Sequence, residues 1–264
     1  MQGLLQNVAR ALLRPVYGVY EKWLWRQIRG GDMPRHIAII PDGNRRWARL
    51  RGLETFFGHR AGYEKMRKVL DWIWELGVET VTIYAMSSEN CLYRSPEERR
   101  HLFELARRGF EELLSDPKIR ERRVRIKVIG RRELVPPDVM ELAERVEMET
   151  SGHDGPLLYI ALCYGGRQEI LDAVKRVAED AVNGRVRPEE LDEERFRKYL
   201  YTSEAPDPDL IIRTSGEERI SNFLLWQSAY SELYFCDAYW PEFRRIDLWR
   251  AIRSYQRRQR RFGR

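Results

Sequence analysis

Strand-like apolar runs alternate with helix-like stretches along most of this chain, and that alternation limits the possible folds more than any other feature. The strand-like runs cover residues 36–41, 78–86, 124–129, 157–163 and 209–213. Stretches with apolar residues three or four apart separate or follow them, at 59–76, 96–114, 137–149, 166–182 and 189–200. Regular alternation of this kind predicts an α/β fold with a mainly parallel central sheet covered by helices.

The alternating region contains no internal repeat, low-complexity tract or long linker, so we expect a single domain over residues 32–264. Residues 1–31 form an N-terminal amphipathic helical extension, in which Pro15 should kink or divide the helix. Its apolar face could pack on the domain, pair with another subunit or lie on a membrane surface. Docking on the protein is the commonest of these outcomes.

Composition argues for a folded protein in a reducing compartment. The chain is 43% hydrophobic, which allows a sizeable core and is unlike disordered sequences. Cys91, Cys163 and Cys236 are odd in number, far apart and in no metal-ligand pattern, so the sequence supports neither a disulfide framework nor a zinc site. No apolar run approaches the roughly 20 residues needed to cross a bilayer. We therefore expect a cytoplasmic protein, soluble or peripheral at the membrane.

The C-terminal segment is strongly basic. Residues 244–264 hold nine arginines against one acid, Asp247. Such a tail could bind nucleic acid, acidic lipid or diphosphate, or it could be a solvated helix face. Leu248, Ile252 and Tyr255 have helical spacing, which favours a packed helix. Because no base-reading motif accompanies the arginines, we expect no nucleic-acid partner.

The stretch HIAIIPDGNRRWAR joins a strand-like run to a candidate anion site. Asp42 would stand at the carboxyl end of the strand, Gly43 permits a tight turn, and the next helix would begin with its amide groups forward. Arg45 and Arg46 match phosphate oxygens, and Asp42 suits an anion if a divalent metal bridges the two. A metal-bound phosphate or diphosphate is the expected ligand. The alternative is that Asp42 or Asn44 only caps the helix.

Further polar residues follow other strand ends, where ligands bind in parallel sheets. The segment RTSGEERISNFLLWQ places Arg213, Arg219 and Ser221 around a glycine turn, as a second anion cradle or as a surface loop whose arginines pair with its own glutamates. Glu232 lies farther on, in an apolar and aromatic stretch where its carboxylate needs an arginine, a hydrogen-bond network or a metal.

Two more segments offer candidate side chains. His59 could donate to phosphate or shuttle a proton, although a lone histidine is more often structural. The run YAMSSEN ends a strand with Ser87, Ser88, Glu89 and Asn90, which could orient a substrate or simply cap the following turn.

From about residue 34 to the C-terminus, the chain resembles the cis-prenyltransferase family, which includes undecaprenyl and dehydrodolichyl diphosphate synthases. The motifs that carry the resemblance are DGNRRWA at 42–48, GHRAG at 58–62, YAMSSEN at 84–90, YGGR at 164–167, DLIIRTSGEERISNFLLWQSAYSELYF at 209–235 and RRFG at 260–263. The resemblance implies repeated condensation of isopentenyl diphosphate onto an allylic diphosphate primer, with magnesium as the cofactor. The product would be a long-chain polyprenyl diphosphate, the precursor of a glycosyl carrier lipid.

The family motifs also imply residue roles. Asp42 and Glu232 look like the magnesium-associated carboxylates. Asn44 and Ser87 could assist proton removal, or the released diphosphate could accept the proton. The implied catalytic residues are Asp42, Asn44, Ser87 and Asn90. The implied allylic diphosphate ligands are Gly43, Asn44, Arg45, Arg46 and His59, and those of isopentenyl diphosphate are Arg213, Arg219 and Ser221. Other matched substrate-binding positions are Trp47, Ser87, Glu89, Arg94, Arg261 and Gly263.

The resemblance further implies an apolar tunnel between the sheet and helices that include residues 96–114, with Ala85 leaving room at its mouth. Pro41, Thr55 and Cys91 stand where bacterial members usually have methionine, arginine and an aromatic residue. The basic N-terminal helix looks more like archaeal members, in which geranylgeranyl diphosphate replaces farnesyl diphosphate as primer.

The ending Arg261-Phe262-Gly263 resembles a family motif that reaches the isopentenyl site, often across a dimer interface, so the resemblance implies a homodimer. An alternative function is a noncatalytic partner subunit of a heteromeric polyprenyl synthase. Such relatives lack the Asp-Gly-Asn site, which is intact here at residues 42–44. The absence of a DDxxD stretch argues against the all-helical trans-prenyltransferases.

Overall fold

A computed structural model describes residues 17–258 of the chain. Six strands form one fully parallel sheet in the order β3-β4-β2-β1-β5-β6. Every residue of β1, β2 and β5 is buried, because central strands of a parallel sheet are covered on both faces. The strands are β1 (His36–Ile40), β2 (Thr80–Tyr84), β3 (Arg125–Ile129), β4 (Leu157–Ala161), β5 (Leu210–Thr214) and β6 (Glu232–Cys236).

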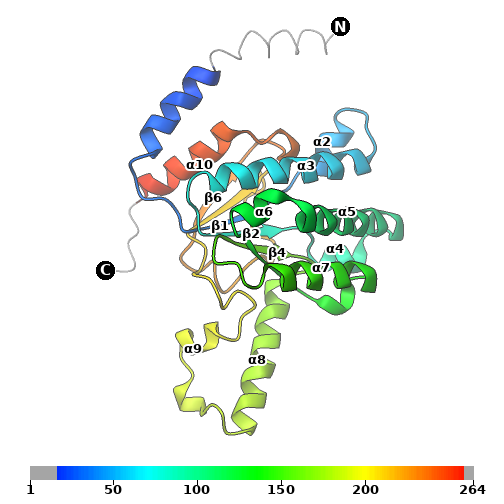
Figure 1. Ribbon diagram of the computed structural model, residues 1–264, viewed down its shortest axis with the longest axis vertical. Helices are drawn as coiled ribbons and strands as arrows, with labels where there is room; N and C mark the ends of the chain where they lie inside the picture. The colour runs from blue at the N-terminus through cyan, green and yellow to red at the C-terminus, as the bar shows by residue number, and fades with distance from the viewer. Residues whose placement is uncertain (1–16, 259–264) are drawn as a thin grey trace.

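Helices surround the sheet, and one pair projects away from it (Figure 1). The α-helices are α2 (Asn44–Arg49), α3 (Thr55–Trp74), α4 (Ser88–Tyr93), α5 (Pro96–Ser115), α6 (Pro117–Glu121), α7 (Pro137–Thr150), α8 (Gly166–Val182), α9 (Glu193–Arg197) and α10 (Arg245–Arg257). Short 3-10 turns are η1 (Arg132–Leu134), η2 (Pro188–Glu190) and η3 (Trp240–Glu242). The prediction of a single α/β domain with a mainly parallel sheet is confirmed.

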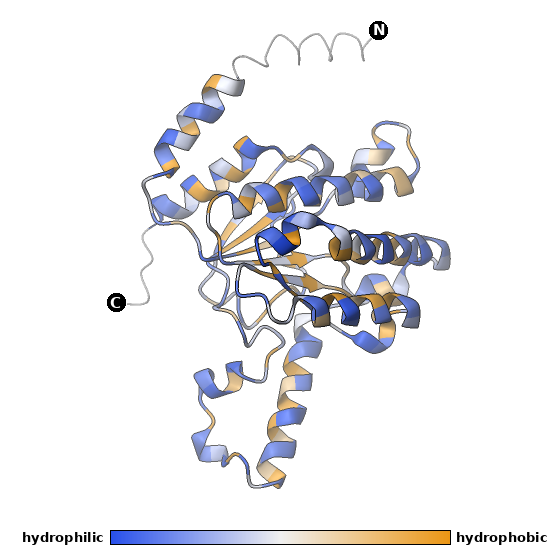
Figure 2. Cartoon of the chain, viewed as in Figure 1, coloured by the Kyte–Doolittle hydropathy of each residue, from blue (hydrophilic) through white to orange (hydrophobic). Residues whose placement is uncertain are grey.

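The hydrophobic core lies on both faces of the sheet. On one face, alternate strand residues such as Ile39 and Ile83 pack with apolar side chains of α3, α5, α7 and α10. On the other face, Tyr84 and Tyr159 pack with Tyr164 and Phe223. Hydrophobic residues accordingly concentrate on the strands and on the sheet-facing sides of the helices (Figure 2). The sheet is thus held rigidly, and its carboxyl edge can position side chains accurately.

The C-terminal helix is packed, as the spacing of its apolar residues predicted. Leu248 and Ile252 of α10 are fully buried. The N-terminal helix, described over residues 17–28, lies against α10: its Leu24 and Ile28 are fully buried, and the Trp25 ring centroid is 5.5 Å from that of Trp249. This part of the extension therefore docks on the protein. Residues 4–16 of the predicted helix, Pro15 included, lie outside the described residues.

Two secondary-structure expectations need correction. The stretch 189–200 is not one helix but the turn η2 followed by α9, because the Asp192 side chain accepts a hydrogen bond from the Arg195 amide and starts a new helix. The strand β6 was missed. It follows β5 through an irregular connection without a helix, which breaks the alternation that predicted the other strands.

The expectation about cysteines was also wrong. Cys91 and Cys163 form a disulfide between α4 and the residues after β4, and Cys236 is free and buried. Spacing could not reveal this pair, because the two residues are 72 positions apart and meet only through the fold. Among the described residues, no helix combines the length and apolar character that crossing a membrane requires.

Candidate functional site

Asp42 and Arg213 meet at the carboxyl edge of the sheet. Ile40 and Arg213 are register partners on neighbouring strands β1 and β5, which places Asp42, two residues on, beside the end of β5. Arg213 donates from Nη2 to Asp42 Oδ2 at 2.8 Å and from Nη1 to Ser221 Oγ at 2.6 Å. The Arg213 side chain is only 5% exposed, whereas Asp42 is 31% exposed, so the arginine approaches the carboxylate from the protein interior. The first and second predicted anion motifs therefore form one crevice.

Gly43 makes the turn that connects β1 to α2. Its φ of 99° belongs to the left-handed region, and a Cβ there would lie 2.8 Å from Ser215 Cβ and 2.7 Å from Tyr239 Cδ1. Gly43 is also the N-cap of α2, and no side chain caps this helix. The alternative that Asp42 or Asn44 merely caps the helix is therefore wrong. Asp42 Oδ1 instead accepts from the Gly43 amide at 2.6 Å.

The arginines of the crevice share one carboxylate. Arg46 donates to Glu217 Oε1 at 2.7 Å and to Ser215 Oγ at 2.6 Å. Arg219 pairs with the other oxygen of Glu217. The predicted alternative, in which loop arginines pair with the loop's own glutamates, therefore holds for Arg219. This pairing places the guanidinium groups of Arg46 and Arg219 on either side of the Glu217 carboxylate. The same two groups could bind one ligand anion together.

A second cationic group lies around Glu98, at the start of α5. The Oε1 atom of Glu98 is 2.5 Å from Arg94 Nη1, 3.2 Å from His59 Nε2 and 3.7 Å from Arg45 Nε. Burial lowers the pKa of His59, and its hydrogen bond to Glu98 offsets this only in part. The His59 imidazole is therefore expected to be neutral near pH 7. Arg94 also donates to Asn90 Oδ1 at 3.0 Å.

The SSEN run begins α4. Ser87 Oγ accepts a hydrogen bond from the Asn90 amide at 3.1 Å and so caps this helix, as one of the two predicted readings expected. Glu89 accepts from the Asn222 side chain at 2.9 Å, which links α4 to the loop that carries Ser221. Ser87, Glu89 and Asn90 thus come from a short helix held between the two cationic groups.

An apolar cavity of about 210 Å³ opens beside these groups. Pro41, Asn44 and His59 belong to its lining, as do Ala85 and Met86 after β2. Its walls come from the sheet and from α3 and α5, in agreement with the expected tunnel. The remaining lining is mostly aliphatic, such as Leu70, Leu102, Ala106, Leu113, Leu158, Ile160 and Leu162. A polar rim above a cavity of this kind suits a ligand with an anionic head and a hydrocarbon tail.

Gly62 allows Asn44 to lie against α3 at the mouth of the cavity. A Cβ at Gly62 would be 2.4 Å from Asn44 Oδ1. That oxygen is buried and has no hydrogen-bond partner within the described residues. Asn44 therefore presents an unsatisfied acceptor beside the cavity mouth, on the turn that follows Asp42.

Glu232 is not brought to Asp42 within one chain. It begins β6 in register with Leu210, three residues before Arg213, which is about 10 Å along a strand. Its carboxylate accepts from Arg258 Nη1 at 2.5 Å. The Trp47 ring lies under the Arg51 guanidinium, whose Cζ is 4.5 Å from the ring centroid. Arg261 and Gly263 lie outside the described residues.

Asp42 fits a magnesium ion that shares its ligands with a phosphate. Its side chain is 31% exposed at the rim, and Mg²⁺ in proteins is usually held by one or two carboxylates together with substrate phosphate oxygens and water. Between residues 17 and 258 no cluster of three or more His, Cys, Asp or Glu could hold a metal by itself. The donor set therefore suits a shared ion rather than a closed protein cage.

Sequence reasoning missed Glu98, and it expected Glu217 only as a partner of the arginines in its own loop. The sequence did contain a pattern that involves Glu98. A serine followed three residues later by a glutamate, here Ser95 and Glu98, is a capping pattern that marks the start of a helix. Ser95 Oγ does accept from the Glu98 amide at 3.2 Å, but the Glu98 carboxylate turns to His59 and Arg94 instead. The pairing of Glu217 with Arg46 carried no comparable signal, because Arg46 comes from a distant segment of the chain.

Comparisons with known proteins agree with this geometry. The chain matches a family model described as "Putative undecaprenyl diphosphate synthase" over residues 40–263. It is 51% identical over 256 residues to a tritrans,polycis-undecaprenyl-diphosphate synthase (GGDP specific) of Sulfolobus acidocaldarius, covering 97% of this chain and 98% of that protein. A tritrans,polycis-undecaprenyl-diphosphate synthase (geranylgeranyl-diphosphate specific) of Methanopyrus kandleri is 51% identical over 261 residues, covering 99% of this chain and 96% of that protein. Lavandulyl diphosphate synthase of Lavandula x intermedia, solved in complex with dimethylallyl diphosphate, has a TM-score of 0.83 at 33% identity, covering 88% of this chain and 99% of that one.

Proposed function

This chain belongs to the undecaprenyl diphosphate synthase family, and from that membership we propose that it is a cis-prenyltransferase that condenses isopentenyl diphosphate repeatedly onto an allylic diphosphate primer. Geranylgeranyl diphosphate is the preferred primer, as the names of the archaeal relatives support. The observation that carries the proposal is the apolar cavity with two arginine groups at its mouth.

In the proposed arrangement, the primer's diphosphate lies on the α2 amides with Arg45, Arg46 and His59, and its hydrocarbon tail enters the cavity. Arg213, Arg219 and Ser221 hold the diphosphate of isopentenyl diphosphate. The allylic carbon–oxygen bond breaks, the terminal alkene carbon of isopentenyl diphosphate bonds to the allylic carbon, and a proton leaves to form the new double bond. The departing diphosphate gains negative charge, so aimed arginines stabilise the transition state more than the ground state.

The residues near the reacting carbons have distinct tasks in this proposal. Ser87 Oγ accepts a hydrogen bond from the Asn90 amide. The hydroxyl hydrogen of Ser87 therefore remains available to donate to a substrate oxygen. Asn44, which lines the cavity and has no hydrogen-bond partner for its buried Oδ1 within the described residues, is proposed to assist proton removal. Asp42 would hold Mg²⁺, which when bound supplies positive charge to the diphosphate.

Product analysis tests the proposed function. The purified chain with magnesium, labelled isopentenyl diphosphate and geranylgeranyl diphosphate should yield long polyprenyl diphosphates, with a lower kcat/KM when farnesyl diphosphate is the primer. A chelator should abolish incorporation, because the charge on the diphosphate is then uncompensated. A folded chain that incorporates nothing would instead favour a partner-dependent subunit.

We further propose that the chain is a homodimer, supported by an unpartnered apolar stripe on α8. This helix projects from the body (Figure 1). Its inner face packs on Phe196 and Leu200, whereas Leu171, Val174 and Val182 are 54%, 48% and 88% exposed. A second copy would cover this stripe. We propose in addition that the 261–263 ending reaches the isopentenyl site of the partner.

Light scattering tests the dimer. The wild-type chain should be a dimer at micromolar concentration, and the double variant Leu171→Asp, Val174→Asp should be a monomer, since two charges cannot be buried without partners. The charge change Arg176→Glu, at an exposed position on the opposite side of the same helix from the stripe, is the matched control and should leave the dimer intact. A monomeric wild type would contradict the proposal.

Peripheral membrane contact through the N-terminal helix is also proposed. Tyr17, Val19 and Trp23 are 40%, 70% and 46% exposed, and Arg253 lies beside the Trp23 ring, so aromatic and basic groups share this surface, as in interfacial helices. In a flotation assay with vesicles that contain acidic lipid, a large fraction of the full chain should float with the vesicles. The fraction should be smaller for the double variant Val19→Ser, Trp23→Ser. Equal flotation of the two would exclude this helix as the contact.

A further inference from the structure

The helix α4 carries several proposed site residues but is too short to be stable alone. It spans only Ser88–Tyr93, and isolated helices of this length do not persist in water. Ser87 caps it, Asn90 lies within it, and Arg94 follows it and contacts Glu98 and Asn90. The position of these groups at the cavity mouth therefore depends on what ties α4 to the rest of the fold.

Non-covalent ties hold the two ends of this helix: Ser88 and Glu89 at its beginning, and the pair of Arg94 with Glu98 of α5 just after its last residue. The Ser88 amide donates to the Tyr164 carbonyl at 2.8 Å, and the Glu89 carboxylate accepts from Asn222. The second half gains little from burial, because Leu92 and Tyr93 are 42% and 80% exposed. Among residues 17–258, one side-chain hydrogen bond, from Arg99 Nη1 to the Cys91 carbonyl at 3.0 Å, reaches the middle of the helix from α5.

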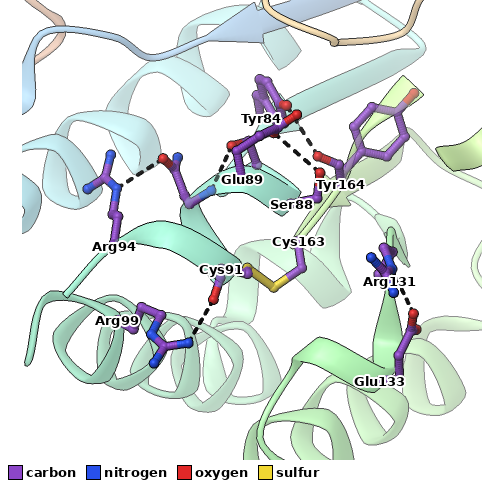
Figure 3. The surroundings of a disulfide bond; sticks show 12 residues. Tyr84, Ser88, Glu89, Cys91, Arg94, Arg99, Arg131, Glu133, Cys163 and Tyr164 are labelled. Atoms are coloured by element: carbon purple, nitrogen blue, oxygen red, sulfur yellow. Dashed lines mark hydrogen bonds and ion pairs between the residues drawn. A yellow bond between two sulfur atoms is a disulfide. The ribbon is translucent and has the colours of Figure 1, made fainter. Parts of the chain in front are cut away.

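The disulfide supplies the covalent tie at this point (Figure 3). Cys91, in the middle of α4, is 4% exposed, and Cys163, two residues beyond the end of β4, is fully buried. The Cys163 backbone is itself fixed, since its carbonyl accepts from the Arg131 amide at 3.2 Å. The bond thus fastens α4 to the carboxyl end of a sheet strand, which is the most rigid element near the site.

We propose that the Cys91–Cys163 disulfide is a positioning device for the reaction, which holds α4 so that Asn90 and Arg94 face the substrate at the cavity mouth. This inference rests on the proposed function. The two cysteines touch no substrate themselves. A misplacement of about 1 Å in groups that align a substrate can cost about 10²-fold in rate, so the loss of one tether is expected to matter for turnover.

The disulfide also closes a loop of 72 residues and so stabilises the whole fold. The two roles are separable, because Arg213 and Ser221 belong to β5 and the loop after it and do not depend on α4 for their mutual contact. A pure stability effect would loosen all parts of the body alike. A positioning effect is confined to α4 and to the steps that use it.

The experiment compares the wild-type chain with the double variant Cys91→Ala, Cys163→Ala, both at a temperature well below unfolding. Mass spectrometry after thiol alkylation first verifies the disulfide in the wild type. Elongation kinetics with geranylgeranyl diphosphate and amide hydrogen exchange are then measured on both. Cys236→Ala, which removes the free buried cysteine, is the matched control and should behave as wild type.

We expect kcat of the double variant to fall about 10- to 100-fold, with KM for isopentenyl diphosphate little changed, and exchange to rise in residues 88–94 but not in 44–49. Unchanged turnover, or a rise in exchange that is equal throughout the body, would overturn the inference while leaving the proposed function intact. If the wild type itself incorporates no isopentenyl diphosphate, the proposed function fails, and the inference fails with it.

Discussion

Replacing Asp42 by alanine should lower turnover by about 10² to 10³-fold or more. This carboxylate lies at the end of β1, bonded to the Gly43 amide and to Arg213, at the point where both proposed diphosphates meet. Its removal eliminates the proposed magnesium ligand and leaves Arg213 without its acid. Asp42 belongs to the crevice rather than to the core, so the variant should stay folded. Steady-state kinetics at saturating magnesium measure the effect.

The matched control is Asp42→Asn, which keeps an oxygen for the Gly43 amide but removes the charge. It should be nearly as inactive as the alanine variant, because a neutral amide is a poor ligand for a divalent cation. Substantial activity in Asp42→Asn would mean that the residue only shapes the turn. Near-parental turnover of Asp42→Ala would show that the site has been assigned to the wrong residues.

Replacing Arg213 by lysine should lower kcat/KM for isopentenyl diphosphate about 10- to 100-fold, mainly through KM. The buried guanidinium bonds Asp42 with one nitrogen and Ser221 with another, so it joins β1 to the loop after β5. A lysine carries the same charge, but its single ammonium cannot reproduce both bonds. Each lost bond to a charged group typically costs about 1.5–3 kcal/mol.

The change should act on one substrate more than the other, so KM for the allylic primer should move much less. Arg145→Lys on α7 is a suitable control, since that arginine forms an exposed pair with Glu149 and lies outside the crevice. If Arg213→Lys raised both KM values equally, Arg213 would serve the general shape of the crevice rather than isopentenyl diphosphate. Thermal unfolding of both variants separates these outcomes from instability.

Periodicity predicted the sheet well where helices separate the strands, and failed where they do not. The runs around β1 to β5 were recognised because each is apolar and has a helical pattern before or after it. β6 follows β5 after an irregular, aromatic-rich segment, so nothing marked its start. This miss also hid the position of Glu232: without a strand there, its place at the amino end, away from Asp42, could not be inferred.

The residue types of the site were predicted better than their partners. Strand ends in a parallel sheet converge, which is why Asp42, Arg213 and Ser221 could be expected in one crevice. The pairing of Glu217 with Arg46, and of Glu98 with His59, depends on how loops and helices from distant segments pack together. The same is true of the Cys91–Cys163 bond. Side-chain partnerships of this kind are set by tertiary packing and leave no periodic trace in a sequence.

Because Glu217 pairs with two arginines, an anion that binds in the crevice must replace this carboxylate rather than meet unoccupied guanidinium groups. Arg46 and Arg219 hold one carboxylate, and Arg213 holds another, so the positive charge of all three is largely compensated in this structure. A singly charged anion offers these guanidinium groups no more than Glu217 and Asp42 already supply. A diphosphate brings more charge and more oxygens and can displace both. The crevice should therefore discriminate among anions by charge density, and abundant monovalent ions should compete poorly for it.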